Sequence, residues 1–454
     1  MGFSGLEGLK WVELHFTDLA GSLRHIIVSA KSLSEVPLNE AFSKLDGSSV
    51  RGFTGIEESD LILRPDIKTL TKLPWGEGLG RAICGVYRGE ARFPKDPRYV
   101  AERLDREFEA LNIKPFVSVE LEFFIFDKVA VEVNPWRQTY EIHSSEAPWA
   151  NSPFMNRPKD GYYSTYPKDR FAALKTELGE VLLNNFGIEV EAIHHEVAAT
   201  SQHEINFRGG SLTYVSDSVQ TVKHVIRVLS FMKGCVATFM PKPIHGDNGS
   251  GMHVHVSLWR GGENVFYDQN DGYAGLSQEA RYFIGGLLEH GRSLSALVNP
   301  TTNSYKRLVP GYEAPTYLAW SRSNRSAAVR IPTYSRSDKA LRIEYRPPDP
   351  SANPYLATTA IVLAGLDGIR KKIDPGDPID ENLYEVTARR STHNVKTLPR
   401  TLDEALDALE SDNGWLKPIF PDELLGSYVE LKRTESKTVN SYPTPVEFYN
   451  YLDI

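Results

Sequence analysis

The segment Val119-Glu120-Leu121-Glu122-Phe123 alternates carboxylates with apolar residues, and three later segments repeat this pattern with imidazole and guanidinium groups. They are Gln202-His203-Glu204-Ile205-Asn206-Phe207-Arg208, Met252-His253-Val254-His255-Val256-Ser257-Leu258 and Leu341-Arg342-Ile343-Glu344-Tyr345-Arg346. Successive side chains of a β-strand point to opposite faces, so each segment has one apolar and one ionisable face. Burying such charge is costly unless a cation or another partner compensates it. The segments therefore predict strands that line a funnel or barrel holding metal ions and an anionic substrate.

Length and composition narrow the class of protein. The chain has 454 residues, of which 41% are hydrophobic and 24% charged, so we expect two or three globular domains around a large core. The net charge of −8 argues against a general nucleic-acid surface. The two cysteines, Cys84 and Cys235, rule out a disulfide framework and fit a reducing cytoplasm. We find no signal peptide and no apolar run of about 18 residues, so we expect no membrane contact.

A change of character near residue 95 predicts a domain boundary. Asp96 followed by Pro97 is a helix N-cap with proline at the first helical position, and apolar residues then recur at helical spacing through Leu111. We therefore divide the chain into domains at residues 1–95 and 96–454. Elsewhere we expect strands over 11–16, 24–28 and 188–192, a loop over 42–63, and helices over 169–186, 217–232 with Asp217 as cap, 357–372 and 402–411. The aromatic and apolar residues 445–454 need a partner surface.

Carboxylates and imidazoles on the ionisable strand faces form a candidate ligand set. Its members are Glu120, Glu122, Glu196, Glu204 and Glu344, with His253, His255 or both. Paired carboxylates repel each other unless a proton or cation lies between them. A solvated strand face or a hydrogen-bonded core histidine would explain single members, but not the whole set. Oxygen-rich ligation favours Mg²⁺ or Mn²⁺ over zinc.

Arginines near the last of these strands suggest an anionic substrate. Arg307, Arg325, Arg330, Arg342 and Arg346 lie within 40 residues among apolar neighbours. Guanidinium groups bind carboxylate and phosphate through paired hydrogen bonds. Metal ions beside such a cluster indicate phosphoryl chemistry. The glycine-rich segment 246–251 lacks the ending of a P-loop, but its place before the His253 strand favours a backbone cradle for a small ligand.

Taken together, these motifs resemble the type I glutamine synthetase family, in that family's order and over nearly the whole chain. The residues that carry the resemblance are Lys44-Leu45-Asp46-Gly47-Ser48-Ser49, Val119-Glu120-Leu121-Glu122-Phe123-Phe124, His194-His195-Glu196-Val197, Met240-Pro241-Lys242-Pro243, Gly246 through His253, Asn303 through Pro315, Asn324 through Pro332, and Arg342 through Ala357. The resemblance implies an α+β fold, with an N-terminal β-grasp domain and a catalytic domain of the glutamine synthetase/guanido kinase type. Its curved antiparallel sheet, flanked by helices, would form a bifunnel active site between subunits of a ring, usually two stacked hexamers.

The family reaction is ATP-dependent ligation of ammonia to the γ-carboxylate of glutamate through γ-glutamyl phosphate. The resemblance implies two or three Mg²⁺ or Mn²⁺ ions, held by Glu122, Glu196 and Glu204 and by Glu120, His253 and Glu344. Glutamate would be bound by Asn248, Gly249, His253, Arg307, Glu313 and Arg346, and ATP by Glu191, His255, Ser257, Arg325, Arg330, Lys339 and Arg342. The catalytic residues would be Asp46 from the adjacent subunit, which binds ammonium and removes its proton, with Glu313 on a flap, Arg325 and Arg346.

Departures from the family pattern bear on regulation. Asn382-Leu383-Tyr384 continues with Glu385-Val386-Thr387 rather than Asp-Leu-Pro, so we expect an alpha-type member without adenylylation. Gly55 stands where the feedback-inhibited alpha subtype carries arginine, and Gly209 where an aromatic residue usually lies near adenine. A small nitrogen-regulatory protein is a partner that the sequence leaves open.

Two other functions remain at this point. A γ-glutamyl-amine ligase would use a polyamine or ethanolamine in place of ammonia, and a regulatory relative would have lost catalysis. The presence of both Asp46 and Glu313 favours ammonia, because the ammonium-site acids are often altered in the amine-using group. The intact ligands and arginines argue against a loss of catalysis.

Overall fold

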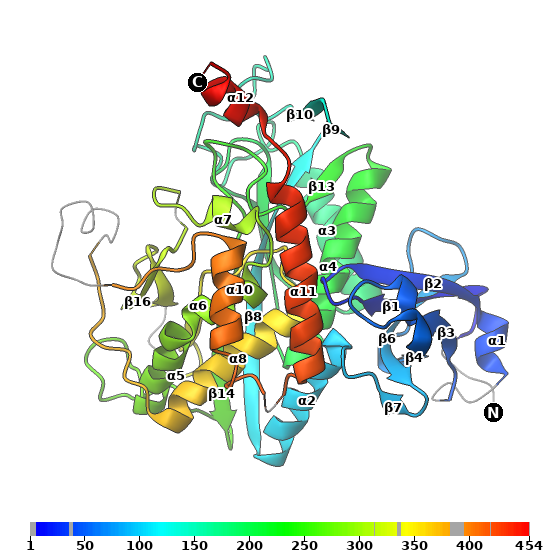
Figure 1. Ribbon diagram of the computed structural model, residues 1–454, viewed down its shortest axis with the longest axis horizontal. Helices are drawn as coiled ribbons and strands as arrows, with labels where there is room; N and C mark the ends of the chain where they lie inside the picture. Colours follow the sequence, from blue (N-terminus) through cyan, green and yellow to red (C-terminus); the bar gives the residue numbers. More distant parts are fainter. Residues whose placement is uncertain are drawn as a thin grey trace.

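A computed structural model describes residues 6–35, 40–312, 314–333, 337–381, 395–417 and 419–453. Figure 1 shows a small N-terminal sheet beside a larger body in which helices surround a long sheet. Cys84 and Cys235 are both free thiols. Among the described helices, none is long and apolar enough to cross a membrane.

The N-terminal part is a mixed sheet with the strand order β2-β1-β6-β4-β3, to which β5 and β7 add through β6. Its strands are β1 (Trp11–Thr17), β2 (Leu23–Ser29), β3 (Ser43–Asp46), β4 (Asp60–Pro65), β5 (Thr71–Lys72), β6 (Leu79–Arg88) and β7 (Ala91–Arg92), with the short helix α1 (Ala30–Ser34). β1 pairs antiparallel with β2 and parallel with β6, which gives the β-grasp arrangement.

The larger part is built on a second sheet with the order β11-β12-β8-β14-β18-β17-β16, with β13 on β8 and β15 on β14. Its strands are β8 (Ile113–Phe126), β11 (Val190–His195), β12 (Gln202–Phe207), β13 (Val236–Thr238), β14 (Met252–Arg260), β15 (Glu263–Asn264), β16 (Tyr317–Arg322), β17 (Ala327–Ile331) and β18 (Ile343–Tyr345). The pairs are antiparallel except β16 with β17. A separate hairpin joins β9 (Lys128–Asn134) and β10 (Arg137–His143).

Helices cover the second sheet and pack on one another. The helices of this part are α2 (Pro97–Ala110), α3 (Ala172–Phe186), α4 (Leu212–Met232), α5 (Gln278–Glu289), α6 (Gly291–Val298), α7 (Ser304–Arg307), α8 (Pro354–Lys371), α10 (Leu402–Ser411) and α11 (Asp422–Asn440), with α12 (Pro445–Tyr451) at the periphery. The almost fully buried α8 packs against α2, α4, α5 and α6 and is the centre of this helical layer. The apolar face of the sheet is therefore buried, which leaves its ionisable face for other groups.

The structure confirms most of the predicted elements, including the four segments of alternating charge as β8, β12, β14 and β18. Asp96 accepts a hydrogen bond from the Arg98 amide and caps α2. Gly187 ends α3 in the left-handed conformation, at φ 64°, where a residue with a Cβ atom is strained. The α+β class and the β-grasp are confirmed as well.

Two expectations were wrong. Asp217 does not cap a helix but lies inside α4, whose N-cap is Ser211. The Asp105 carboxylate also caps this helix, because it accepts hydrogen bonds from the Leu212 and Thr213 amides. The predicted loop over 42–63 contains β3 and the start of β4. β3 is a short edge strand, and its pairing with β4 supplies the order that its sequence alone does not indicate.

An ion-pair network around Arg98 joins the N-terminal sheet to the helical layer. The buried Arg98 guanidinium donates to Asp217 on α4 at 2.8 Å, to Asp66 at 2.8 Å and to Glu102 at 2.8 Å. The Tyr355 hydroxyl on α8 donates to the same Asp217 carboxylate at 2.7 Å. Asp217, which was predicted to be a cap, therefore joins α4 to Arg98 of α2 and to Tyr355 of α8.

We expect Asp217→Ala to destabilise the protein by about 3 kcal/mol, because the buried Arg98 guanidinium loses one of its three carboxylate partners and the buried Tyr355 hydroxyl loses its acceptor. The measurement is the thermal unfolding midpoint. Glu189→Ala, which removes an exposed ion pair with Arg208, is the control and should cost about 0–1 kcal/mol. Equal midpoints for the two variants would contradict the network's role.

Candidate functional site

Strand register places the ionisable residues in adjoining rows on one face of the second sheet. Glu120 of β8 lies opposite Asn206 of β12 and His253 of β14. Glu122 lies opposite Glu204, which in turn lies opposite His194 of β11. His255 lies opposite Glu344 of β18, which pairs with Arg330 of β17. Because register alone fixes which side chains are neighbours across strands, the sequence alternation becomes a surface of carboxylates and imidazoles.

The first cluster consists of Glu120, His253 and Glu344, each of which has a ligand atom within 4.8 Å of the others. His253 Nδ1 lies 2.9 Å from Glu120 Oε2 and 3.8 Å from Glu344 Oε1. Glu344 is fully buried and accepts from Arg330 at 2.5 Å and Arg346 at 2.6 Å. His255 Nε2 lies 2.9 Å from the other oxygen of Glu120.

Electrostatics keep this cluster in the form that binds a cation. Burial raises the pKa of Glu344, but Arg346 and the neighbouring imidazoles outweigh it, so the pKa falls to about 2. Burial, with the Arg346 charge, lowers the pKa of His253, so the imidazole is neutral at pH 7. An ionised carboxylate and a neutral imidazole are the states that act as metal ligands.

The second cluster consists of His194, Glu196 and Glu204, whose ligand atoms also lie within 4.8 Å of one another. His194 lies 3.5 Å from Glu196 and 3.4 Å from Glu204. Glu122 adjoins this cluster and accepts from the Gly251 amide at 2.8 Å and from Gln202 at 3.0 Å. Burial first, and then the charges of Glu196 and Glu204, raise the pKa of Glu122 well above its ordinary value. Such repulsion is relieved when a cation binds among the carboxylates.

Both clusters open into one cavity of about 270 Å³, which we call the acidic cavity. Its lining includes Asn248, Gly249, Arg307, Arg325, Arg330 and Arg346 besides the residues of the two clusters other than Glu344, which lies buried behind the wall. The Arg307 guanidinium is held by the backbone carbonyls of Pro347 at 2.7 Å and of Pro348 and Arg346 at 3.3 Å. Cations thus face carboxylates across a polar space, an arrangement that suits a small anion bound beside metal ions.

A second cavity, of about 410 Å³, adjoins the first and shares Glu120 and Asn206 with it. It is lined by Phe116, Ser118, Val119, Glu191, Phe207, Gly209, His255, Ser257, Trp259, Lys339, Ala340, Leu341 and Arg342. Arg342 contacts His255 at 3.3 Å, and the Trp259 indole donates to Ser257 at 3.0 Å. The cavity therefore has cationic side chains that suit phosphate groups and aromatic rings that suit a nucleotide base.

Gly209 in this cavity lies so close to β8 that a Cβ atom would be 2.2 Å from the Val117 carbonyl oxygen and 2.9 Å from the Phe116 ring. The partly exposed Phe116 ring therefore occupies the space that a side chain at residue 209 would need. An aromatic residue of the neighbouring strand thus lines the cavity beside Gly209, the position where the family resemblance implied an aromatic side chain.

The structure brings most of the predicted site residues together, with two exceptions. Asp46 lies on β3 and lines neither cavity, and its carboxylate accepts from Ser48 and Ser49, which lowers its pKa. Glu313 lies outside the described residues, although Tyr312 and Ala314 on either side of it line the acidic cavity.

Sequence reasoning missed several residues of the acidic cavity, namely His194, Gln202, Tyr162, Tyr163 and Tyr312. His194 alternates with Glu196, a signal that was present in the sequence. Its neighbour His195 is instead buried against Glu146 at 2.9 Å. Tyr162 and Tyr163 stack on each other and pack edge-on against His194, from a segment with no periodic pattern to reveal them.

We expect the affinity for Mg²⁺ or Mn²⁺ to rise with pH, because Glu122 must lose its proton before it binds a cation, and its pKa is raised. Binding should release up to about one proton per ion at a pH below that raised pKa. Calorimetric titration in buffers of different ionisation enthalpy measures the proton count. Glu122→Gln should bind the ion more weakly and reduce the proton release, and equal release in both proteins would contradict the assignment.

Comparisons with known proteins agree with this geometry. A sequence model of the "Glutamine synthetase, catalytic domain" matches residues 94–451, and one of the "Glutamine synthetase, beta-Grasp domain" matches residues 8–89. The chain is 51% identical to a glutamine synthetase of Sulfolobus acidocaldarius, over 98% of this chain and 96% of that one. A glutamine synthetase of Thermotoga maritima is 42% identical over 98% of this chain and 97% of its own. A cryo-EM structure of the Plasmodium falciparum glutamine synthetase superposes with a TM-score of 0.88 at 28% identity, with 99% of each chain covered. The chain therefore belongs to the glutamine synthetase family.

Proposed function

We propose that this chain synthesises glutamine from glutamate and ammonia, with ATP as the source of energy. The observation that carries the proposal is the acidic cavity, where two carboxylate–imidazole clusters face four arginines. The full-length similarity to glutamine synthetases supports the same reaction. The adjoining second cavity provides space for a nucleotide whose terminal phosphate would reach the acidic cavity.

We assign divalent cations, Mg²⁺ or Mn²⁺, to the two clusters. Glu120, His253 and Glu344 would hold one ion, and Glu122, Glu196 and Glu204 another, with His194 as an added candidate ligand. The mixture of five carboxylates with imidazoles fits these hard cations. When bound, such ions neutralise phosphate charge and stabilise the transferring phosphoryl group.

The arginines would bind and orient the substrates. Arg307 is oriented by three backbone carbonyls and would bind the glutamate α-carboxylate together with Asn248 and Gly249. Arg325 and Arg346 would stabilise the γ-carboxylate as it becomes an acyl phosphate, and Glu313 would shield that group from water. Arg346 already donates to Glu344, so its guanidinium is fixed at the edge of the first cluster.

ATP would occupy the second cavity. Lys339, Arg342 and Arg330 would contact its phosphates, and Glu191, His255 and Ser257 would bind along the cavity wall. Phe116 and Trp259 flank this wall and offer ring faces for the adenine. Arg330 lines the acidic cavity rather than the second one, so its contact would be with the terminal phosphate.

The position of Asp46 supports an active site shared between copies of the chain. Because Asp46 lies on the N-terminal sheet and lines neither cavity, it would serve the acidic cavity of a neighbouring copy. Hydrogen bonds from Ser48 and Ser49 lower the pKa of this carboxylate, which keeps it ionised for ammonium. We propose a dodecamer of two hexameric rings, located in the cytoplasm, and we retain the domain division between residues 95 and 96.

Phosphate release from ATP and glutamate, measured with ammonium and with ethanolamine or a polyamine, tests the reaction. We expect ammonium to be the preferred acceptor. Asp46→Ala should lower the ammonium-dependent rate about 10²- to 10⁴-fold, because it removes the group that takes the proton. Asp60→Ala, which alters the exposed carboxylate directly opposite Asp46 on β4, is the matched control and should keep the wild-type rate.

Activity with amines but not with ammonium would refute this choice of acceptor. The absence of activity with either would indicate a relative that has lost catalysis. Neither the clusters nor the arginines show the losses that such a relative should have.

The C-terminal helix α12 supports a further prediction about assembly. Its apolar side chains are largely exposed in the single chain, with Tyr449 at 89% and Leu452 at 77%. A capping box formed by Thr444 and Glu447 nevertheless stabilises the helix. Figure 1 shows it at the periphery of the molecule, beyond α11. Such a surface suits a strap that packs on a neighbouring subunit.

Deletion of residues 448–454 should therefore weaken assembly, because it removes the exposed apolar face. Light scattering on the purified protein measures the particle size, and smaller particles are expected. Deletion of residues 453–454 alone keeps α12 and should leave the particle unchanged. If the longer deletion also leaves the size unchanged, the strap is refuted.

A further inference from the structure

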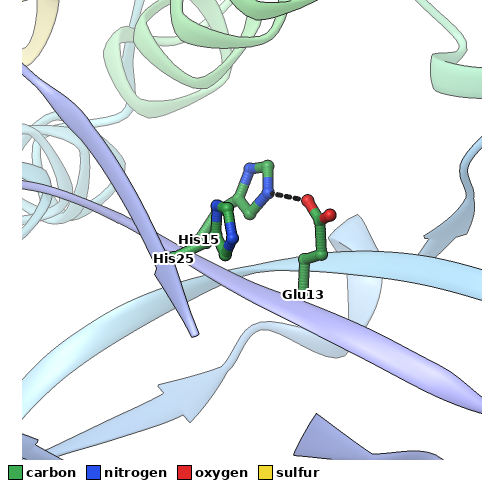
Figure 2. Close-up of side chains that lie close together, drawn as sticks. All are labelled: Glu13, His15 and His25. Carbon is green, nitrogen blue, oxygen red and sulfur yellow. Dashed lines mark hydrogen bonds and ion pairs between the residues drawn. The ribbon is translucent and has the colours of Figure 1, made fainter. Parts of the chain in front are cut away.

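A second group of ligand-type side chains lies in the N-terminal sheet, away from the acidic cavity. Glu13 and His15 alternate along β1, and His25 lies directly opposite His15 on β2. Figure 2 shows the two imidazoles side by side, with one hydrogen-bonded to the Glu13 carboxylate. Strand alternation and cross-strand pairing thus place all three side chains on one face of the sheet. None of them lines the acidic or the second cavity.

The ligand atoms of this group lie close enough together for small side-chain movements to place them around one metal ion. His15 Nε2 lies 2.7 Å from Glu13 Oε2, and one ligand atom from each of Glu13, His15 and His25 lies within 4.8 Å of the others. Ligand atoms around a tetrahedral Zn²⁺ lie roughly 3.4 Å apart, given bond lengths of about 2.0–2.1 Å. The exposed His25 side chain is free to make the remaining movement, because strand β2 is at the edge of its sheet.

The buried end of the group has unsatisfied polar atoms. His15 has no exposed surface, and its Nδ1 atom has no hydrogen-bond partner among the described residues. His224 of α4 packs edge-on against His15, with ring centroids 5.3 Å apart, and its Nε2 atom likewise has no partner among the described residues. A core histidine that only fills space would be expected to bond both nitrogens or to be replaced by an apolar residue. Two buried imidazole nitrogens beside the Glu13–His15–His25 group are thus left without a hydrogen-bond partner among the described residues, which marks this junction as one whose polar groups are incompletely satisfied.

The charges around the group favour a transition metal that bonds to imidazole nitrogen over a hard cation that is held mainly by carboxylate charge. Glu13 supplies one carboxylate, while Arg81, its neighbour on β6, brings a positive charge. Arg81 donates to Thr221 on α4 and lies over the Phe186 ring, which anchors the guanidinium on the α4 side. A hard cation such as Mg²⁺ depends on several oxygen ligands and would gain little here. Borderline metals such as Zn²⁺ bind imidazole strongly.

We propose that Glu13, His15 and His25 form a binding site for a borderline divalent transition metal, Zn²⁺ foremost, at the junction of the N-terminal sheet with α4. The site is separate from the catalytic ions and does not depend on the proposed reaction. A bound ion would fix β1 and β2 to each other beside His224 of α4. Glu13, His15 and His25 themselves line none of the described cavities, although Arg81 beside Glu13 lines one of about 270 Å³, so the role assigned to the ion is to hold the two strands together rather than to bind a substrate.

The test compares zinc binding by the full-length protein and two histidine variants. Each protein is stripped with a chelator, equilibrated with Zn²⁺ in an excess of Mg²⁺, freed of unbound metal and analysed by mass spectrometry for zinc per chain. His25→Ala alters an exposed side chain, so the fold should survive, which circular dichroism checks. His143→Ala is the matched control, since His143 is also an exposed strand histidine, 2.9 Å from a glutamate.

Wild-type protein and His143→Ala should bind about one zinc ion per chain more than His25→Ala. The affinity of this ion should fall by more than about 100-fold in His25→Ala, since loss of a group outside the ligand shell already costs about 10- to 100-fold. Co²⁺ in place of Zn²⁺ should show the visible absorption of a four-coordinate site, reduced in His25→Ala alone. Equal zinc content in wild type and His25→Ala, or an equal loss in both variants, would overturn the proposal.

Discussion

Repulsion among carboxylates on one sheet face is the constraint on which the site depends. Register brings Glu122 opposite Glu204 and leaves Glu196 close to both, so that the pKa of Glu122 rises well above its ordinary value. The negative charge of Glu344, by contrast, is balanced by Arg330 and Arg346, so this carboxylate stays ionised. One cluster is thus balanced by the protein's own cations, whereas the other requires a proton or an added cation. Strand register thus determines which of the two clusters requires an added cation.

Burial of the opposite, apolar face of the same sheet offsets the free-energy cost of this charge repulsion. Val119, Leu121 and Phe123 alternate with the acids of β8 and are fully or almost fully buried. Each apolar side chain contributes roughly 1.5–3 kcal/mol on burial, which offsets the cost of holding like charges together on the other face. α8 and its neighbours complete this core and also anchor Asp217 and Tyr355 in the Arg98 network. One face of the sheet thus holds the charged site residues, and the other face packs in the core that stabilises the fold.

The sequence predicted those parts of the fold that have a period or a local cap. The alternation in β8, β12 and β14 and the Asp96 cap of α2 follow local rules, and the structure confirms them. Local rules failed for Asp217, because a carboxylate in the middle of α4 is explained only by Arg98, which is 119 residues away in sequence. They also failed for Tyr162 and Tyr163, whose place beside His194 depends on the path of an irregular segment. The pairing of His15 with His25 required knowledge of register across a turn.

The close approach of Gly209 to β8 has a consequence for how relatives of this chain are compared. The backbone contact leaves no room for a side chain at residue 209, and the ring of Phe116 on the facing strand fills the space instead. The aromatic surface at this place is therefore supplied by β8, although residue 209 itself has no side chain. A comparison made position by position would record the glycine at residue 209 and overlook the ring of Phe116 beside it. Only the three-dimensional wall of the cavity shows that an aromatic ring still lies at this place.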